Sequence, residues 1–149
     1  MMTDKKHLEA RHDLAALLGR VLMSVIFIWS GGSKVLAAGW YTSYFASLGV
    51  PFPDLAWMAA LVIELGGGLA LLLGVQARAA AGILGSWCLI TALIGHRDFA
   101  DFDTRIQFMK NVAMAGGFLF IATFGAGAYT LERLRLYILS TKIGRLTNG

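Results

Sequence analysis

Apolar residues are concentrated in four long stretches of the chain, and most charged residues lie between them and at the two ends. The stretches cover residues 14–36, 55–76, 77–95 and 107–130. Each is close to or above the roughly 20 residues with which an α-helix crosses a bilayer. Buried helices of soluble proteins are usually shorter. The pattern therefore predicts an all-α, multi-pass membrane protein, a four-helix bundle that forms a single domain over residues 1–149.

The composition agrees with a membrane protein. Hydrophobic residues make up 57% of the chain and the mean hydropathy is +0.66, which is too apolar for an ordinary soluble domain. The only cysteine, Cys88, lies inside the third stretch. A single thiol excludes an intramolecular disulfide, a redox-active cysteine pair and a thiolate metal cluster.

The first stretch has two interpretations. Its basic flank and the small residues at 37–39 are typical of a cleaved signal peptide. It is longer than the apolar part of such a peptide, however, and it contains Arg20 and Lys34. We therefore expect a retained helix.

The positions of lysine and arginine predict the orientation. With the N-terminus inside, nine of the 13 basic residues fall on the cytoplasmic side and four on the outer side. The positive-inside rule then places both termini in the cytoplasm. The net charge of +4 follows from this placement, and no nucleic-acid partner is expected. The C-terminal residues 131–149 mix apolar and basic positions, which predicts an amphipathic helix on the anionic inner leaflet.

The loop before the second stretch is rich in aromatic residues. Trp40, Tyr41, Tyr44 and Phe45 recur at helical spacing, which predicts a short helix in the outer interface. One interpretation is an aromatic belt that anchors the loop. The other is a lid or lateral gate over a site below it.

Glu64 is the most informative residue of the chain. It stands inside an otherwise uncharged stretch, about 13 Å of helix away from Leu55. A carboxylate at this depth costs at least ~2.5–3.5 kcal/mol, so it should face protein and have a partner. Gly67 and Leu71 share its helical face, which predicts that Glu64 points into the bundle.

Further polar residues are predicted to lie above Glu64, nearer the outer surface. They are Ser30 and Lys34 in the first helix, His96 at the end of the third, and Lys110 and Asn111 in the fourth. Together with Glu64 they predict an outward-opening polar pocket. Either lysine can pair with the carboxylate, and the sequence leaves this choice open.

The chemistry of this set allows two hypotheses. Two cations against one carboxylate favour an anion or the carbonyl oxygen of a quinone, with Glu64 and His96 as the catalytic pair that handles protons. Alternatively, Glu64 and a lysine form an interhelical clamp. Asn111 is expected to donate an interhelical hydrogen bond, and Arg20 to snorkel to the cytoplasmic headgroups. No metal site is predicted, because the remaining histidines belong to the opposite side of the membrane.

These residues, in their order and spacing, resemble the DoxX family of small four-helix bacterial membrane proteins from Gly19 to about Thr130. The similarity rests on pairs and short motifs along all four stretches: Gly19-Arg20, Ser30-Gly31 with Lys34, Leu48–Pro51, Glu64–Gly67, Leu73-Gly74 with Arg78, His96, Gln107-Phe108, Lys110-Asn111 and Gly116-Gly117.

The resemblance implies a bacterial inner-membrane protein. The family is named after a subunit of a terminal quinol oxidase, and similar proteins are linked to thiosulfate:quinone oxidoreduction and to quinone or aromatic-compound stress. It therefore implies a quinone- or small-molecule-linked subunit of a membrane redox or detoxification system.

The chain has no haem pair, flavin fingerprint or dithiol, so no intrinsic cofactor is expected. A redox role then requires quinone or redox partner proteins, and homo-oligomers fit the picture as well. Whether the chain is an enzyme stays open. The alternatives are a non-enzymatic scaffold or assembly subunit and, ranked last, a small-molecule transporter.

Overall fold

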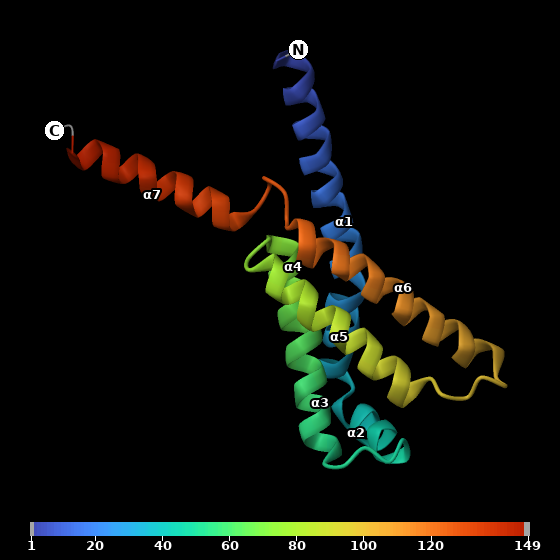
Figure 1. The fold of residues 1–149 in the computed structure, drawn as a ribbon. Helices are drawn as coiled ribbons and strands as arrows, with labels where there is room; N and C mark the ends of the chain where they lie inside the picture. Colours follow the sequence, from blue (N-terminus) through green and yellow to red (C-terminus); the bar gives the residue numbers. More distant parts are fainter. Residues whose placement is uncertain (1, 148–149) are drawn as a thin grey trace.

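A computed structural model describes residues 2–147, with side chains described for residues 5–140. Within that range the regular structure is entirely helical (Figure 1). In chain order the elements are α1 (Met2–Leu36), α2 (Ala38–Ser47), α3 (Pro53–Leu61), the π-helix η1 (Val62–Gly66), α4 (Gly67–Leu73), α5 (Ala77–Gly95), α6 (Phe102–Phe124) and α7 (Leu131–Thr147). The predicted all-α fold is confirmed.

Four segments are long and apolar enough to cross a membrane, as predicted: Lys5–Leu36, Pro53–Leu73, Ala77–Gly95 and Phe102–Phe124. The second consists of α3, η1 and α4 in succession. The predicted fourth helix, 107–130, was placed too late in the sequence, since α6 begins at Phe102 and ends at Phe124. Asp101 caps α6 by accepting a hydrogen bond from the Thr104 amide, so the charged residues before 107 are already helical. Gly125, with φ of 89°, ends the helix although small apolar residues continue.

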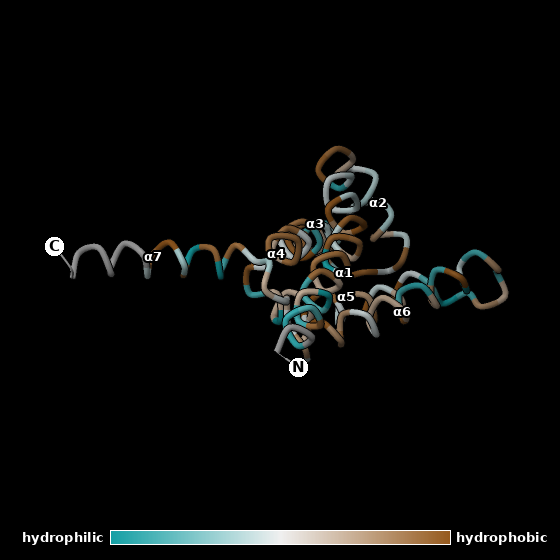
Figure 2. Tube along the Cα trace, turned by 90° about the horizontal axis from the view of Figure 1, so that it is seen from above, coloured by the Kyte–Doolittle hydropathy of each residue, from teal (hydrophilic) through white to brown (hydrophobic). Residues whose placement is uncertain are grey.

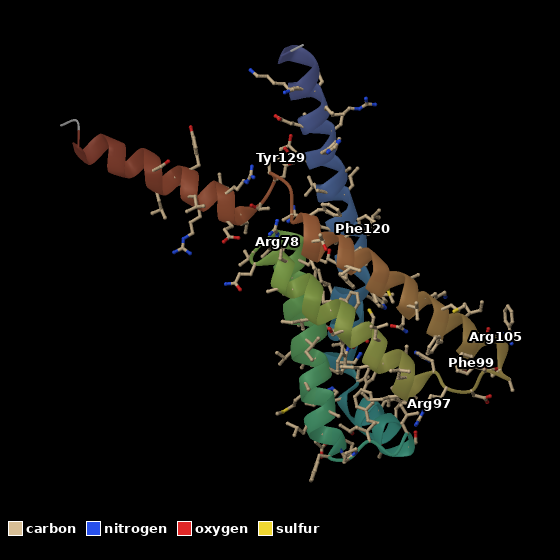
Figure 3. All side chains as sticks on the ribbon, in the orientation of Figure 1. Arg78, Arg97, Phe99, Arg105, Phe120 and Tyr129 are labelled. Carbon is tan, nitrogen blue, oxygen red and sulfur yellow. The ribbon has the colours of Figure 1, made fainter. Side chains whose placement is uncertain are left out.

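The helices form two packed units that meet at one end and diverge toward the other. α1 packs along η1 and α4, and α5 packs along α6. In Figure 1 the α5–α6 pair diverges from α1 and α3 toward the end where α2 lies. Figure 3 places Arg78 and Tyr129 at the end where the two units meet, and Arg97, Phe99 and Arg105 at the end where they diverge.

The core lies where the two units meet. Phe27 of α1 and Phe118 of α6 make an edge-to-face contact with ring centroids 5.3 Å apart, and Leu71 and Leu84 are fully buried beside them. Close packing depends on glycine, since a Cβ on Gly31 would lie 2.8 Å from the backbone nitrogen of the facing helix. Small residues therefore set the distance between α1 and η1.

Arg20 corrects one prediction. Its side chain does not snorkel to headgroups but is buried, at 1% exposure. The guanidinium donates to the carbonyl oxygens of Leu71, at 3.4 Å, and Tyr129. Nearby, the Asp13 carboxylate accepts a hydrogen bond from the Ala128 amide at 2.7 Å. These contacts attach the segment after α6 to α1 and α4.

α7 projects away from the bundle, and its side chains from 131 to 140 are exposed (Figure 2). The N-terminal part of α1 and the start of α7 lie at the same end of the molecule (Figure 1). Both termini therefore emerge on one side of the four spans. That this side is cytoplasmic, and that α7 rests on lipid, stay predictions.

Candidate functional site

Glu64 lies at the centre of the π-helix η1, between α3 and α4. π-Helical turns are rare, occur mostly as short interruptions of α-helices and are frequent at functional sites. The carboxylate is buried, at 6% exposure. The wider turn changes the direction of the side chain relative to a regular helix, so the local backbone and the buried charge mark the same residue.

Lys34 is the partner of Glu64. Its Nζ lies 2.7 Å from Glu64 Oε2 and donates a second hydrogen bond to Ser30 Oγ at 2.9 Å. The ammonium also lies 4.6 Å from the ring centroid of Tyr41, in cation–π geometry. The choice between Lys34 and Lys110 is thereby resolved in favour of Lys34.

Two tryptophans bond to this ion pair or its backbone. The inner group of the site is defined as Ser30, Lys34, Trp57, Glu64 and Trp87. Trp87 of α5 donates its indole N–H to Glu64 Oε1 at 3.0 Å, so both carboxylate oxygens accept a hydrogen bond. Trp57 of α3 donates to the Lys34 carbonyl oxygen at 2.9 Å. Neither was predicted. A signal was available for Trp87, because an indole N–H in mid-membrane needs an acceptor and few are present.

A cavity of about 730 Å³ lies beside the ion pair. Its lining includes all the residues that the sequence singled out as a site: Ser30, Lys34, Glu64, His96, Lys110 and Asn111. Aromatic side chains of α2 and α5 supply further wall: Tyr41, Tyr44, Phe45 and Trp87. The structure thus brings the predicted residues together around one space, while their roles stay predictions.

The outer polar residues of the cavity differ from the inner ones in their bonding. Among the described residues 5–140, no side-chain hydrogen bond is made by Lys110 or by His96, which leaves them open to a ligand. Burial lowers the pKa of His96, which therefore favours its neutral form. A neutral imidazole can both donate and accept a hydrogen bond.

Asn111 bonds differently from the prediction. Its Nδ2 donates to the carbonyl oxygen of Gln107 in the same helix, at 3.0 Å. Across the α5–α6 interface it is the acceptor, since its Oδ1 lies 3.4 Å from the Thr91 hydroxyl. The prediction that Asn111 donates a hydrogen bond between helices is therefore wrong. Its side-chain Nδ2 donates to the preceding turn of α6, and its Oδ1 accepts the bond from α5.

Apolar contacts close the cavity toward the Arg20 end of the bundle. Phe27 lines the cavity and packs edge-to-face on Phe118. Below them, a Cβ on Gly117 would lie 3.2 Å from the end of the Met23 side chain. Ser24, fully buried on α1, bonds within its own helix. This arrangement is typical of a pocket with an apolar floor.

Comparison with known proteins assigns the family. The DoxX family model matches residues 15–97, more than half of the chain. This chain belongs to the DoxX family. It is similar to Inner membrane protein YqjF of Escherichia coli (strain K12), with 39% identity over 124 residues that cover 82% of this chain and 92% of that protein. Inner membrane protein YphA of the same strain is 36% identical over 129 residues, covering 83% and 92%. No solved structure matches.

The DoxX match includes Lys34, Glu64 and His96, and it ends before α6. The bonded inner group is therefore within the region that the family model describes, whereas Lys110 and Asn111 lie beyond it. The four spans and the named inner-membrane relatives make this DoxX-family chain a multi-pass protein of the bacterial inner membrane, in contact with the lipid bilayer.

Proposed function

We propose that this DoxX-family protein binds a quinone, or a small molecule with a similar head group, beside the Lys34–Glu64 pair. It would serve as a quinone-linked subunit of a membrane redox or detoxification system. One observation carries the proposal: a single cavity contains a buried, fully bonded carboxylate together with the unpartnered polar side chains of His96 and Lys110.

The charges of the cavity support an electron-rich ligand. Lys34 and Lys110 oppose the single carboxylate of Glu64, so donors and positive charge are in excess. A quinone presents carbonyl oxygens that accept hydrogen bonds, and charge-assisted hydrogen bonds are stronger than neutral ones. Aromatic walls suit a flat ring, and the volume falls within the roughly 300–1,000 Å³ of small-molecule sites.

The residues then take distinct roles. Lys110 and His96 donate hydrogen bonds to a quinone oxygen, while Trp87 and Lys34 hold Glu64 in place. Reduction of a quinone to a quinol takes up two electrons, which a redox partner protein would supply, and two protons from water at the outer mouth of the cavity, which His96 and Glu64 would relay to the quinone oxygens. On oxidation the same groups accept the protons.

Quinone binding by the purified protein in nanodiscs tests the proposal. We expect Lys110→Met to weaken binding about tenfold, the effect of losing one charge-assisted hydrogen bond. Glu64→Gln is expected to weaken it as well. Arg105→Met removes a cation outside the cavity and is the matched control. Equal affinity in wild type and both cavity variants, or no binding by any of them, would refute the proposal.

A non-enzymatic scaffold or assembly subunit is the second candidate, and the inner group favours it. The bonds of Glu64 with Lys34 and Trp87 join η1, α1 and α5, which is what a clamp requires. In that case Glu64→Gln would lower bundle stability while the activity of the partner complex stays unchanged. Isolation of the native complex in mild detergent supplies the material for both measurements.

A further inference from the structure

Some residues that line the cavity are exposed in the middle of membrane-spanning helices. Ile26 of α1 lines the cavity and is 49% exposed, and Ala113 of α6 lines it and is also exposed. Ile26 lies ten residues from the end of α1 at Leu36, and Ala113 eleven from the start of α6 at Phe102. Both are thus about 15 Å of helix from the outer end of their spans. At that depth, the part of an exposed side chain that does not face the cavity faces lipid.

α1 and α6 contact each other at about the depth of Ile26 and one turn further in. Phe27 and Phe118 form the contact, and Met23 packs against Gly117 one turn further down. Both helices also line the cavity, and α6 diverges from α1 toward the outer end (Figure 1). The exposed, cavity-lining residues Ile26 and Ala113 thus border the space between the diverging helices.

α2 covers a different side of the cavity. Its Tyr41 hydroxyl lies 2.7 Å from Ser33 Oγ at the end of α1. At the end of α5, a Cβ on Gly95 would lie 3.6 Å from the Tyr44 hydroxyl. α2 thus extends from α1 to α5 and leaves the α1–α6 side uncovered.

We propose that the gap between α1 and α6, bordered by Ile26 and Ala113, is an entrance from the bilayer. Its ligand class is a lipid-soluble amphiphile with a polar head and an apolar tail. The head reaches Lys110 and His96 beside the Lys34–Glu64 pair, while the tail stays between the two helices. The identity of the head group rests on the proposed quinone function, but the entrance itself does not.

A tryptophan reporter detects the entrance without any quinone. Trp87 lines the cavity, so in a full-length variant with Trp29→Phe, Trp40→Phe and Trp57→Phe it is the sole tryptophan and reports on that space. In nanodiscs made with phospholipids brominated on the acyl chains, chains that enter the gap quench its fluorescence. We expect Ile26→Phe combined with Ala113→Phe to reduce this quenching, because the added rings fill the opening.

The control variants carry substitutions at the residues next to Ile26 and Ala113. Val25 and Val112 are 58% and 41% exposed, and neither lines the cavity. Val25→Phe combined with Val112→Phe adds the same bulk to the same helices and should leave quenching unchanged. Equal quenching in the entrance and control variants would overturn the entrance.

A second measurement uses a pair of quinones with the same head group, one without a tail and one with two isoprenyl units. The entrance variant should bind the tailed quinone roughly tenfold more weakly and the tail-less quinone with unchanged affinity. Equal losses for both quinones would mean that the added rings block the cavity itself, which overturns the proposal. If quenching falls as expected while wild type binds neither quinone, the entrance stands and the quinone function is refuted.

Discussion

Removing the charge of Glu64 while keeping its shape is the most direct test of the inner group. In Glu64→Gln, Lys34 keeps a buried ammonium that has lost its counter-ion. The two native side chains are only 7% and 8% exposed, so water reaches little of either charge. The substitution also leaves one carbonyl oxygen for two donors, Lys34 Nζ and the Trp87 indole, where the carboxylate has an oxygen for each.

The magnitude follows from the 2.7 Å separation of Lys34 Nζ and Glu64 Oε2. At an effective dielectric constant of about 20, two unit charges at this distance attract by about 6 kcal/mol. Desolvation of two buried ions costs several kcal/mol each, so the intact pair adds little net stability. Breaking it is different, because the desolvation cost of Lys34 remains and the attraction is lost. We expect Glu64→Gln to cost about 3 kcal/mol, the lower end of the range for broken buried pairs, since the amide oxygen still accepts one bond.

The assay is equilibrium unfolding in mixed micelles, with the double variant Lys34→Met and Glu64→Leu as the matched comparison. Removing both charges removes both desolvation costs but leaves the Trp87 indole N–H without its acceptor, so the double variant should be close to wild type in stability. The single variants Glu64→Gln and Lys34→Met should each be less stable than the double variant. Equal stability of Glu64→Gln and the double variant would refute the idea that an orphaned buried ammonium is the source of the loss.

Three further outcomes follow from the same structure. Trp87→Phe should cost about 2 kcal/mol and Trp57→Phe about 1, since the first bonds a charged acceptor and the second a neutral carbonyl, and the same unfolding assay compares them. Gly31→Ala should cost about 1–3 kcal/mol through its backbone clash, whereas Gly32→Ala, with open space around its Cβ, should be neutral or stabilising by up to about 1 kcal/mol. Because burial lowers the pKa of His96, its NMR titration midpoint should lie below the ordinary value of about 6.5. The unfolded chain then binds the proton first, so stability falls as pH drops through this window, and His96→Gln should remove that component.

The membrane spans were predictable because the length of an apolar stretch is a property of the chain alone. The ends of α6 were not, since local chemistry decides them. Asp101 begins the helix with a side-chain cap, so charged residues that look like a loop are helical. Gly125 ends it although the following residues stay apolar, because its left-handed φ interrupts the helical backbone.

Which residues line the cavity was predictable, but the hydrogen bonds among them were not. Burial cost alone requires a partner for Glu64, yet depth places two lysines within reach. The tight approach of α1 at Gly31 decides between them, and that contact depends on the register of two helices remote in sequence. The π-helix has no comparable signature in the apolar pattern. The burial of Arg20 was not predictable for the same reason, because the carbonyl oxygens of Leu71 in α4 and of Tyr129, between α6 and α7, take the place of headgroups.

Lys110 separates the two candidate functions. A clamp requires only the inner group, which is complete without Lys110. The ammonium lies eight residues, or about 12 Å of helix, from the start of α6, and no partner for it occurs among the described side chains. A lysine within a span costs stability, so Lys110→Met should leave the free protein as stable as wild type or more so. If the cavity binds quinone, the same variant should lose affinity about tenfold, which gives opposite signs in the two assays. A protein that is only a scaffold would show the stability result without any change in quinone binding, and a fall in stability would show that Lys110 is structural.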